Sequence, residues 1–202
     1  MPPEIQSRLQ SRTDLPSPPK VALRIIQLAE DPDLEVEVLV KTLSMDPVLL
    51  VKILRMANSA HYPYQNKVGN LEKDIMVIGL NGVLSLALSF SLAKSLRGEQ
   101  GKGLNYTWFW LRALIAGSVC QSLGLFCKRK DLEELFTVAF IQDIGMLVLD
   151  KIEPSLYADL DFHRVSHRQI LAHERNMFGT DHAVVGSWLL SQWKFPEVFV
   201  LA

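Results

Sequence analysis

Apolar residues along this chain recur mainly at intervals of three and four positions, the spacing of one face of an α-helix. The sequence shows neither sustained two-residue alternation nor the dipeptides of tight hairpin turns, so strands are not expected. We therefore predict an all-α protein, a multi-helix bundle with two packed helical lobes. The predicted helices cover residues 19–29, 36–43, 47–57, 71–78, 83–96, 106–125, 132–150 and 181–193, with shorter ones near 155–161 and 166–177 and one starting at Pro196.

Proline and glycine positions mark the predicted boundaries. Residues 1–14 are interpreted as an N-terminal extension, and Asp46-Pro47 predicts an N-cap with proline at the first helical position. The polar segment from Gly98 to Gly103 predicts a hinge that divides a domain of residues 15–202 into lobes of about 15–97 and 104–202. Because the residues before Ala202 are still apolar, we expect the fold to continue beyond that position.

The stretch from Ile75 to Ala93 carries no charge and approaches the length of a membrane-spanning helix. Its start is interrupted by Gly79, Asn81 and Gly82, and three serines dilute the remainder. We therefore expect a turn followed by a buried helix, and no membrane association.

The charge balance excludes strong electrostatic partners. The chain has 21 Lys and Arg against 22 Asp and Glu, a formal net charge of −1, which gives no general attraction to nucleic acid or anionic lipid. The helices of residues 36–60 could mimic a helix-turn-helix, but Lys41, Lys52 and Arg55 are adequately explained as a solvated face. Two cysteines and an N-terminus without the apolar core of a signal peptide favour a cytoplasmic protein.

Three polar residues interrupt otherwise apolar helix faces. Asp143 lies beside Gln142 in the middle of the apolar run 137–149, and a buried carboxylate needs a cation or several donors. Arg112 interrupts a stripe that includes Ile115 and Val119, which predicts that this stripe faces the core. His182 shares its face with apolar residues and begins a helix, where the dipole disfavours the imidazolium, so we expect an inward, neutral ring.

Each of these residues also has a simpler explanation when taken singly. A buried aspartate or an inward histidine is more often a hydrogen-bonded structural group, and an arginine can extend its head into solvent. Three such residues on three helices of one lobe instead favour a common polar pocket.

The chain resembles the HDOD family, a branch of the HD phosphohydrolase fold, over residues 15–202. In the first half the matching motifs are Leu15-Pro16, Asp46-Pro47, the run 54–60 (LRMANSA) and Ile78-Gly79-Leu80. In the second half they are Trp110, Arg112, the run 140–147 (FIQDIGML), Glu174, Phe178-Gly179, Asp181-His182, Gly186 and the run 193–196 (WKFP).

The resemblance implies a degenerate metal centre. Where the superfamily has its His-Asp pair this chain has Gln142 and Asp143, and Arg112 falls at or near the first metal histidine. Asp143 and His182 alone are too few ligands for a hydrolytic metal site. We predict a remnant pocket of Arg112, Gln142, Asp143 and His182, with an Arg112–Asp143 ion pair in the place of the metal and with no metal, cofactor or catalytic residue. His163, His167 and His173 are interpreted as scattered surface histidines.

HDOD proteins are associated with bacterial regulation, so the resemblance implies a non-catalytic signal-transduction module that binds protein partners. The remnant pocket could also hold a small anionic or nucleotide ligand through Arg112. The alternative is a metal-dependent phosphohydrolase that acts on a nucleotide or cyclic dinucleotide, which the fold family favours and the missing histidines oppose.

Overall fold

The computed structural model describes residues 1–12, 15, 20–29, 31, 33–57, 75, 78–96, 103–162 and 164–201. Within these ranges all regular secondary structure is helical, which confirms the predicted all-α class. Most of the predicted hinge from Gly98 to Gly103 and of the predicted helix 71–78 lies outside the described residues.

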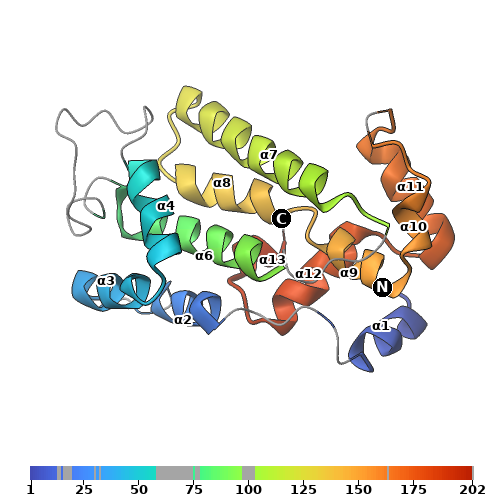
Figure 1. The fold of residues 1–202 in the computed structure, drawn as a ribbon, viewed down its shortest axis with the longest axis horizontal. Helices are drawn as coiled ribbons and strands as arrows, with labels where there is room; N and C mark the ends of the chain where they lie inside the picture. Colours follow the sequence, from blue (N-terminus) through green and yellow to red (C-terminus); the bar gives the residue numbers. More distant parts are fainter. Residues whose placement is uncertain are drawn as a thin grey trace. The chain divides into compact units, whose positions relative to one another are not determined.

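The helices follow the predicted order closely (Figure 1). Their bounds are α1 Pro3–Gln10, α2 Lys20–Ala29, α3 Val36–Ser44, α4 Pro47–Ala57, α6 Leu80–Leu96, α7 Tyr106–Phe126, α8 Leu132–Ile141, α9 Gly145–Ile152, α10 Ser155–Ala158, α11 His167–Phe178, α12 His182–Gln192 and α13 Glu197–Val200. Helix α1 lies in the expected extension and was not predicted from the pattern, although its Ile5 and Leu9 are buried.

The described chain forms two compact units. One consists of residues 1–17, 96–115 and 140–202, and the other of residues 18–95 and 116–139. Segment 116–139, which we expected in the C-terminal lobe, belongs to the same unit as residues 18–95. One boundary between the units, at Ser95 and Leu96, lies close to the predicted hinge. The proposed lobe limits remain predictions.

In the unit of residues 18–95 and 116–139, small residues allow close helix contacts. A Cβ atom on Gly117 of α7 would come within 2.9 Å of the Phe136 ring of α8. The Ser89 hydroxyl of α6 donates to the Thr137 hydroxyl of α8 at 3.0 Å, which pairs two buried polar groups. Asp46 caps α4 as predicted, because its Oδ1 accepts from the backbone N–H groups of Val48 and Leu49 at 3.1 and 3.2 Å.

The turn expected before α6 is present. Gly79 has a φ of +87°, which favours glycine, and α6 begins at the next residue. Among the described residues one helix, α7, is long and apolar enough to cross a membrane, with 33% of its most apolar window buried. Core helices of soluble proteins satisfy the same criterion.

The prediction of one continuous helix over residues 132–150 is wrong, and the difference determines where Asp143 lies. The segment is divided into α8 and α9 by a turn at residues 142–144. Gly145 opens α9 directly against the backbone of α12, where a Cβ atom would lie 2.0 Å from the carbonyl oxygen of His182. The apolar run could not reveal this break, because the turn and α9 are buried apart from exposed Gln142 and half-buried Lys151.

Buried Asp150 at the end of α9 fixes the start of α7. Its Oδ1 accepts from the backbone N–H groups of Gly103 and Leu104 at 3.0 and 2.8 Å, and its Oδ2 accepts from the Tyr106 hydroxyl at 2.9 Å. Tyr106, the first residue of α7 and six positions before Arg112, is therefore held against α9.

Candidate functional site

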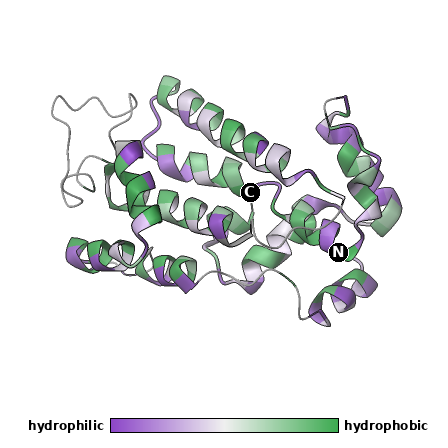
Figure 2. Cartoon of the chain, viewed as in Figure 1, coloured by the Kyte–Doolittle hydropathy of each residue, from purple (hydrophilic) through white to green (hydrophobic). Residues whose placement is uncertain are grey.

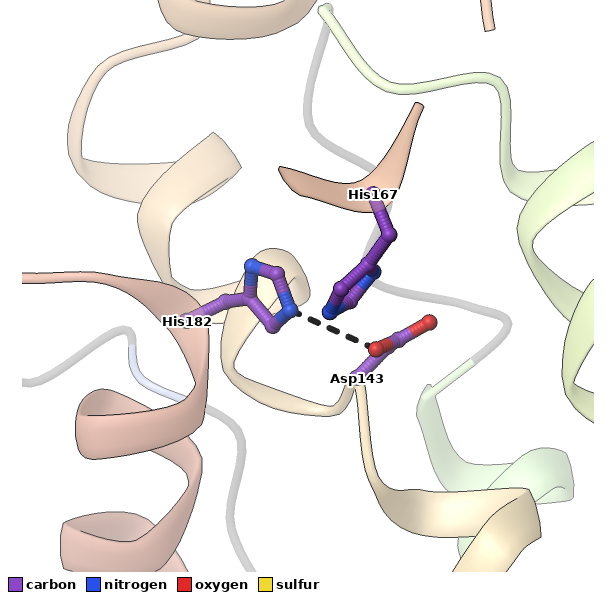
Figure 3. Close-up of side chains that lie close together, drawn as sticks. All are labelled: Asp143, His167 and His182. Atoms are coloured by element: carbon purple, nitrogen blue, oxygen red, sulfur yellow. Dashed lines mark ion pairs between the residues drawn. The ribbon is translucent and has the colours of Figure 1, made fainter. Parts of the chain in front are cut away.

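The candidate site lies within the unit of residues 1–17, 96–115 and 140–202. Asp143 comes from the turn between α8 and α9, and Arg112 comes from α7. His167 and His182 are the first residues of α11 and α12, which follow the N-cap residues Ser166 and Asp181. Figure 3 shows the side chains of Asp143, His167 and His182 close together.

The predicted ion pair between Arg112 and Asp143 is present. The guanidinium Nη2 of Arg112 lies 2.7 Å from Oδ2 of Asp143. The aspartate side chain is 11% exposed and the arginine side chain 32% exposed, so the pair sits at the edge of the interior. The buried carboxylate thus has the cation that its burial requires.

His182 lies on the other side of Asp143. As predicted, its side chain points inward and is 1% exposed. Its Nε2 lies 3.3 Å from Oδ1 of Asp143, the contact drawn as a dashed line in Figure 3. Asp143 therefore bridges two cationic partners, one on each carboxylate oxygen.

The expectation of a neutral His182 ring is wrong. Burial lowers the pKa of His182, but hydrogen bonds to Asp143 and Glu174 and the charges of these carboxylates raise it to about 9. The helix dipole acts against the imidazolium, yet it supplies a fraction of a charge, whereas two whole carboxylates contact the ring. In turn, burial raises the pKa of Asp143, but the His182 hydrogen bond and charge, with the charge of Arg112, hold it below its usual value.

Glu174 is a site residue whose partners were not predicted. It is fully buried, and its Oε2 accepts from the backbone N–H of His182 at 2.8 Å and from the ring Nδ1 at 2.7 Å. The Tyr157 hydroxyl donates to Oε1 at 2.7 Å. Burial and the charge of Glu174 hold the pKa of Tyr157 well above its ordinary value, so the phenol stays a donor. The sequence did contain a signal, because Glu174 lies between buried Ile170 and Phe178 at a spacing of four.

His167 is part of the cluster, although it was interpreted as a surface residue. Its ring lies 5.0 Å from that of His182, edge to face, and its Nδ1 lies 3.5 Å from Nη2 of Arg112. Its exposure explains why no periodicity marks it. Of the other two histidines, His173 contacts the Leu156 carbonyl at 3.0 Å, and His163 lies outside the described residues. Gln142, predicted in the pocket, has an exposed side chain.

Asp143, His167 and His182 each offer a ligand atom, and these atoms lie within 4.8 Å of one another. Two imidazoles and a carboxylate are the ligands of many transition-metal sites. Glu174 orients His182 through its other ring nitrogen, as a carboxylate behind a metal-binding histidine often does. However, Arg112 contacts Asp143 at 2.7 Å and approaches His167 at 3.5 Å. Because the guanidinium already supplies the cation at two of three donors, the residues present do not fit a divalent metal while Arg112 is paired.

Comparison with known proteins decides the family. The model of the HDOD domain matches residues 15–202. The chain belongs to the HDOD family. The expected resemblance is therefore confirmed.

Solved structures share the HDOD fold. An HDOD domain protein of unknown function from Geobacter sulfurreducens has a TM-score of 0.76 and 20% identity, over 96% of this chain and 65% of that one. A protein from Shewanella amazonensis SB2B, named as a candidate phosphohydrolase, has a TM-score of 0.74 and 24% identity, over 98% and 69%. At these identities the likeness concerns the fold alone.

An uncharacterised protein of Treponema pallidum (strain Nichols) is 23% identical over 189 residues. The match covers 91% of this HDOD chain and 36% of the relative. The chain thus spans about a third of the length of this relative.

Proposed function

We propose that this HDOD chain is a non-catalytic, cytoplasmic module of bacterial signal transduction, which acts through binding rather than through bond cleavage. The observation that carries the proposal is the 2.7 Å contact between the guanidinium of Arg112 and Asp143. It puts an organic cation where a hydrolytic member of the superfamily would need an inorganic one.

The charges of the site balance within the protein. Arg112 and the protonated His182 stand against Asp143 and Glu174, so two cations face two carboxylates. A general base works best with a pKa near neutrality. The pKa of His182 lies near 9 and that of Asp143 is lowered, so neither group is suited to remove a proton from water at pH 7. This electrostatic balance favours a structural connection between helices over a reaction centre.

Protein partners are the proposed targets, with a small anionic or nucleotide ligand as the second mode of binding. The side chain of Arg112 is 32% exposed, and the neighbouring His167 is exposed. A phosphate group could contact both and compete with Asp143 for the guanidinium. Such a ligand would weaken one link between α7 and the turn at residues 142–144, which gives binding a structural consequence.

A metal-dependent phosphohydrolase is the second candidate function. The observation in its favour is the proximity of the donor atoms of Asp143, His167 and His182. This reading requires that Arg112 moves away from Asp143 and that a divalent metal takes its place. It also requires ligands beyond these three side chains, from water or substrate.

Metal analysis and hydrolysis assays distinguish the two candidates. Tag-free protein would be equilibrated with Mn²⁺, Mg²⁺ or Zn²⁺, and assayed on nucleotides and cyclic dinucleotides. Stoichiometric metal with turnover that Asp143→Asn abolishes would overturn the regulatory proposal. The regulatory proposal expects neither bound metal nor turnover. If the site binds an anion, phosphate or a nucleotide should raise the Tm of the parent and of Arg164→Ala, but not the Tm of Arg112→Ala.

A further inference from the structure

The end of α7 and the loop after it, residues 123–130, form an exposed tip, which we name the α7 tip; within it only Gly124 is buried. Its apolar side chains are Leu123, Leu125 and Phe126, which are 59%, 52% and 85% exposed. Figure 2 colours this end of α7 as hydrophobic and the loop that leads to α8 as hydrophilic. Ile115 and Val119 of α7 were predicted to face the core and are exposed as well, which corrects that prediction. Large apolar side chains exposed together at one point commonly mark an interaction site.

The packing of α7 on α8 turns the α7 tip outward. A Cβ atom on Gly124 would lie 2.6 Å from Cδ1 of Leu135, so this side of α7 is held against α8. Successive residues of a helix are about 100° apart, which puts Phe126 on nearly the opposite side from Gly124. All of these residues lie within segment 116–139 of one compact unit. The apolar side chains of the α7 tip therefore point away from α8.

The loop of the α7 tip carries three consecutive basic residues, Lys128, Arg129 and Lys130, and all three are exposed. The backbone N–H of Arg129 donates to the carbonyl of Gly124 at 2.9 Å, which closes the loop against the last turn of α7. The guanidinium of Arg129 is bound to Asp131, with its Nε 2.8 Å from Oδ1. Neither lysine has an ion-pair partner among the residues that the structure describes. Two uncompensated positive charges thus lie directly beside the exposed apolar side chains.

The acidic residues at the start of α8 do not cancel this charge at the surface. Residues 128–134 contain three basic and three acidic side chains, so their formal charge is balanced. However, Asp131 already pairs with Arg129, Glu133 is buried and Glu134 is half-buried. The charge that the α7 tip presents to solvent is therefore positive.

Exposed Phe and Leu with lysines beside them are typical of contacts with a membrane interface. The apolar side chains enter the boundary of the acyl chains, while the lysines extend to the lipid phosphates. We propose that the α7 tip docks on an anionic lipid surface. Three apolar side chains cover only a small part of the roughly 800 Å² that a specific protein interface takes from each partner, which disfavours a protein at this point.

The proposal departs from the expectation of no membrane association. That expectation depended in part on the net charge of −1 of the whole chain, and a net charge does not register a local pair of lysines. The α7 tip shares no residue with the cluster of Arg112, Asp143, His167 and His182. Lipid docking and the function proposed for that cluster can therefore be tested separately.

Vesicle flotation of the full chain tests the docking surface. The parent should float with vesicles of phosphatidylcholine mixed with phosphatidylglycerol. It should bind vesicles of phosphatidylcholine alone roughly twentyfold more weakly, because each lysine near an anionic surface contributes about fivefold. Phe126→Ser should weaken binding to the mixed vesicles roughly tenfold or more, since a large apolar side chain no longer enters the lipid. Lys128→Ser combined with Lys130→Ser should reduce binding to the level that the parent shows on phosphatidylcholine alone.

Met45→Ser and Lys41→Ser are matched controls in the same unit, because Met45 is 67% exposed and Lys41 is exposed. They should leave binding within about twofold of the parent. A polarity-sensitive fluorophore on exposed Cys127, in a Cys120→Ser background, should shift its emission to shorter wavelength when mixed vesicles are added.

Three results would overturn lipid docking at the α7 tip. The first is a parent chain that stays out of the lipid fraction of the mixed vesicles. The second is binding that Phe126→Ser and the double lysine variant leave unchanged. The third is a homodimer, seen by sedimentation velocity without vesicles, that Phe126→Ser dissociates, because the α7 tip would then be covered by a second copy of the chain.

Discussion

Glu174 binds His182 at two points, with its carboxylate accepting from the backbone N–H at 2.8 Å and from the ring Nδ1 at 2.7 Å. Both residues are buried, and the two contacts fix the histidine ring relative to its own helix start. Nε2 is thereby turned toward Asp143, which lies 3.3 Å away. The orientation of the His182 ring toward Asp143 thus depends on Glu174, a residue of α11.

Glu174→Gln should destabilise the protein strongly. The substitution leaves the shape nearly unchanged but removes the negative charge beside a protonated, buried histidine, and breaking a buried charge pair costs about 3–5 kcal/mol. Urea denaturation near pH 6 measures the loss. Glu174→Asp keeps the charge and should recover part of the stability, and Glu197→Gln, at an exposed position, should change it by less than about 0.5 kcal/mol. Equal stability of Glu174→Gln and the parent would contradict the role given to this pair.

Stability should fall as the pH rises from about 6.5 to about 9. The pKa of His182 is raised from 6.5 to about 9 in the folded protein, so its contribution is fully present below 6.5 and is lost as the pH passes the folded value. The loss is on the order of 3 kcal/mol for a shift of this size. The lowered pKa of Asp143 acts at the other end, where its contribution is lost as the pH falls below about 3.8.

The difference between variants isolates this alkaline loss from other titrations. Unfolding free energies would be measured from pH 5 to 9.5 for the parent, His182→Gln and His173→Gln. His182→Gln should be less stable at pH 6 and should lack most of the alkaline decline. His173→Gln should keep the slope, because His173 contacts a backbone carbonyl and not a carboxylate. If the slope survived in His182→Gln, the ring would not be protonated in the folded state.

Much of the fold could be predicted because helix signals are local. The N-cap at Asp46 and the turn at Gly79 depend on one or two residues each, and the structure shows both. The break at residues 142–144 depends instead on the close approach of α12 to Gly145. That approach joins segments about forty residues apart, and periodicity within one segment does not record it.

The site was predicted in part for the same reason. Asp143 and His182 interrupt apolar faces, so the pattern indicated their burial, and the predicted Arg112–Asp143 pair is present although Arg112 is only half-buried. His167 is exposed and interrupts nothing. The charge of His182 is set by Glu174 and Asp143 together, and local reasoning from the helix dipole gave the opposite sign. On α7, an apolar stripe was assigned to the core because a single sequence does not distinguish a core face from an unpaired one.

Asp150→Ala should lower stability by on the order of 3–5 kcal/mol. The Asp150 carboxylate accepts hydrogen bonds from Gly103, Leu104 and Tyr106. Removing it takes this acceptor from three donors, and each lost hydrogen bond costs about 1–3 kcal/mol of stability before the structure relaxes. Asp150→Asn retains a carbonyl oxygen for the backbone donors and should lose less than half as much. Asp159→Ala, at an exposed position, is the control. Amide hydrogen exchange should show faster exchange at Leu104 in Asp150→Ala, and unchanged protection there would indicate that the loop is held by other contacts.

Arg112→Ala should increase the affinity of the protein for Zn²⁺ or Mn²⁺ by at least roughly tenfold, the equivalent of 1.4 kcal/mol. The substitution removes the cation that lies 2.7 Å from Asp143, while the donor atoms of Asp143, His167 and His182 stay within 4.8 Å of one another. Isothermal titration calorimetry of tag-free protein measures the affinity, with Arg164→Ala, whose side chain is 87% exposed, as the control for a lost surface charge. Adding Asp143→Asn to Arg112→Ala should return the affinity to the parent level, because a carboxylate ligand is lost. If Arg112→Ala bound metal no better than the parent, the guanidinium would not be what keeps a metal from this cluster.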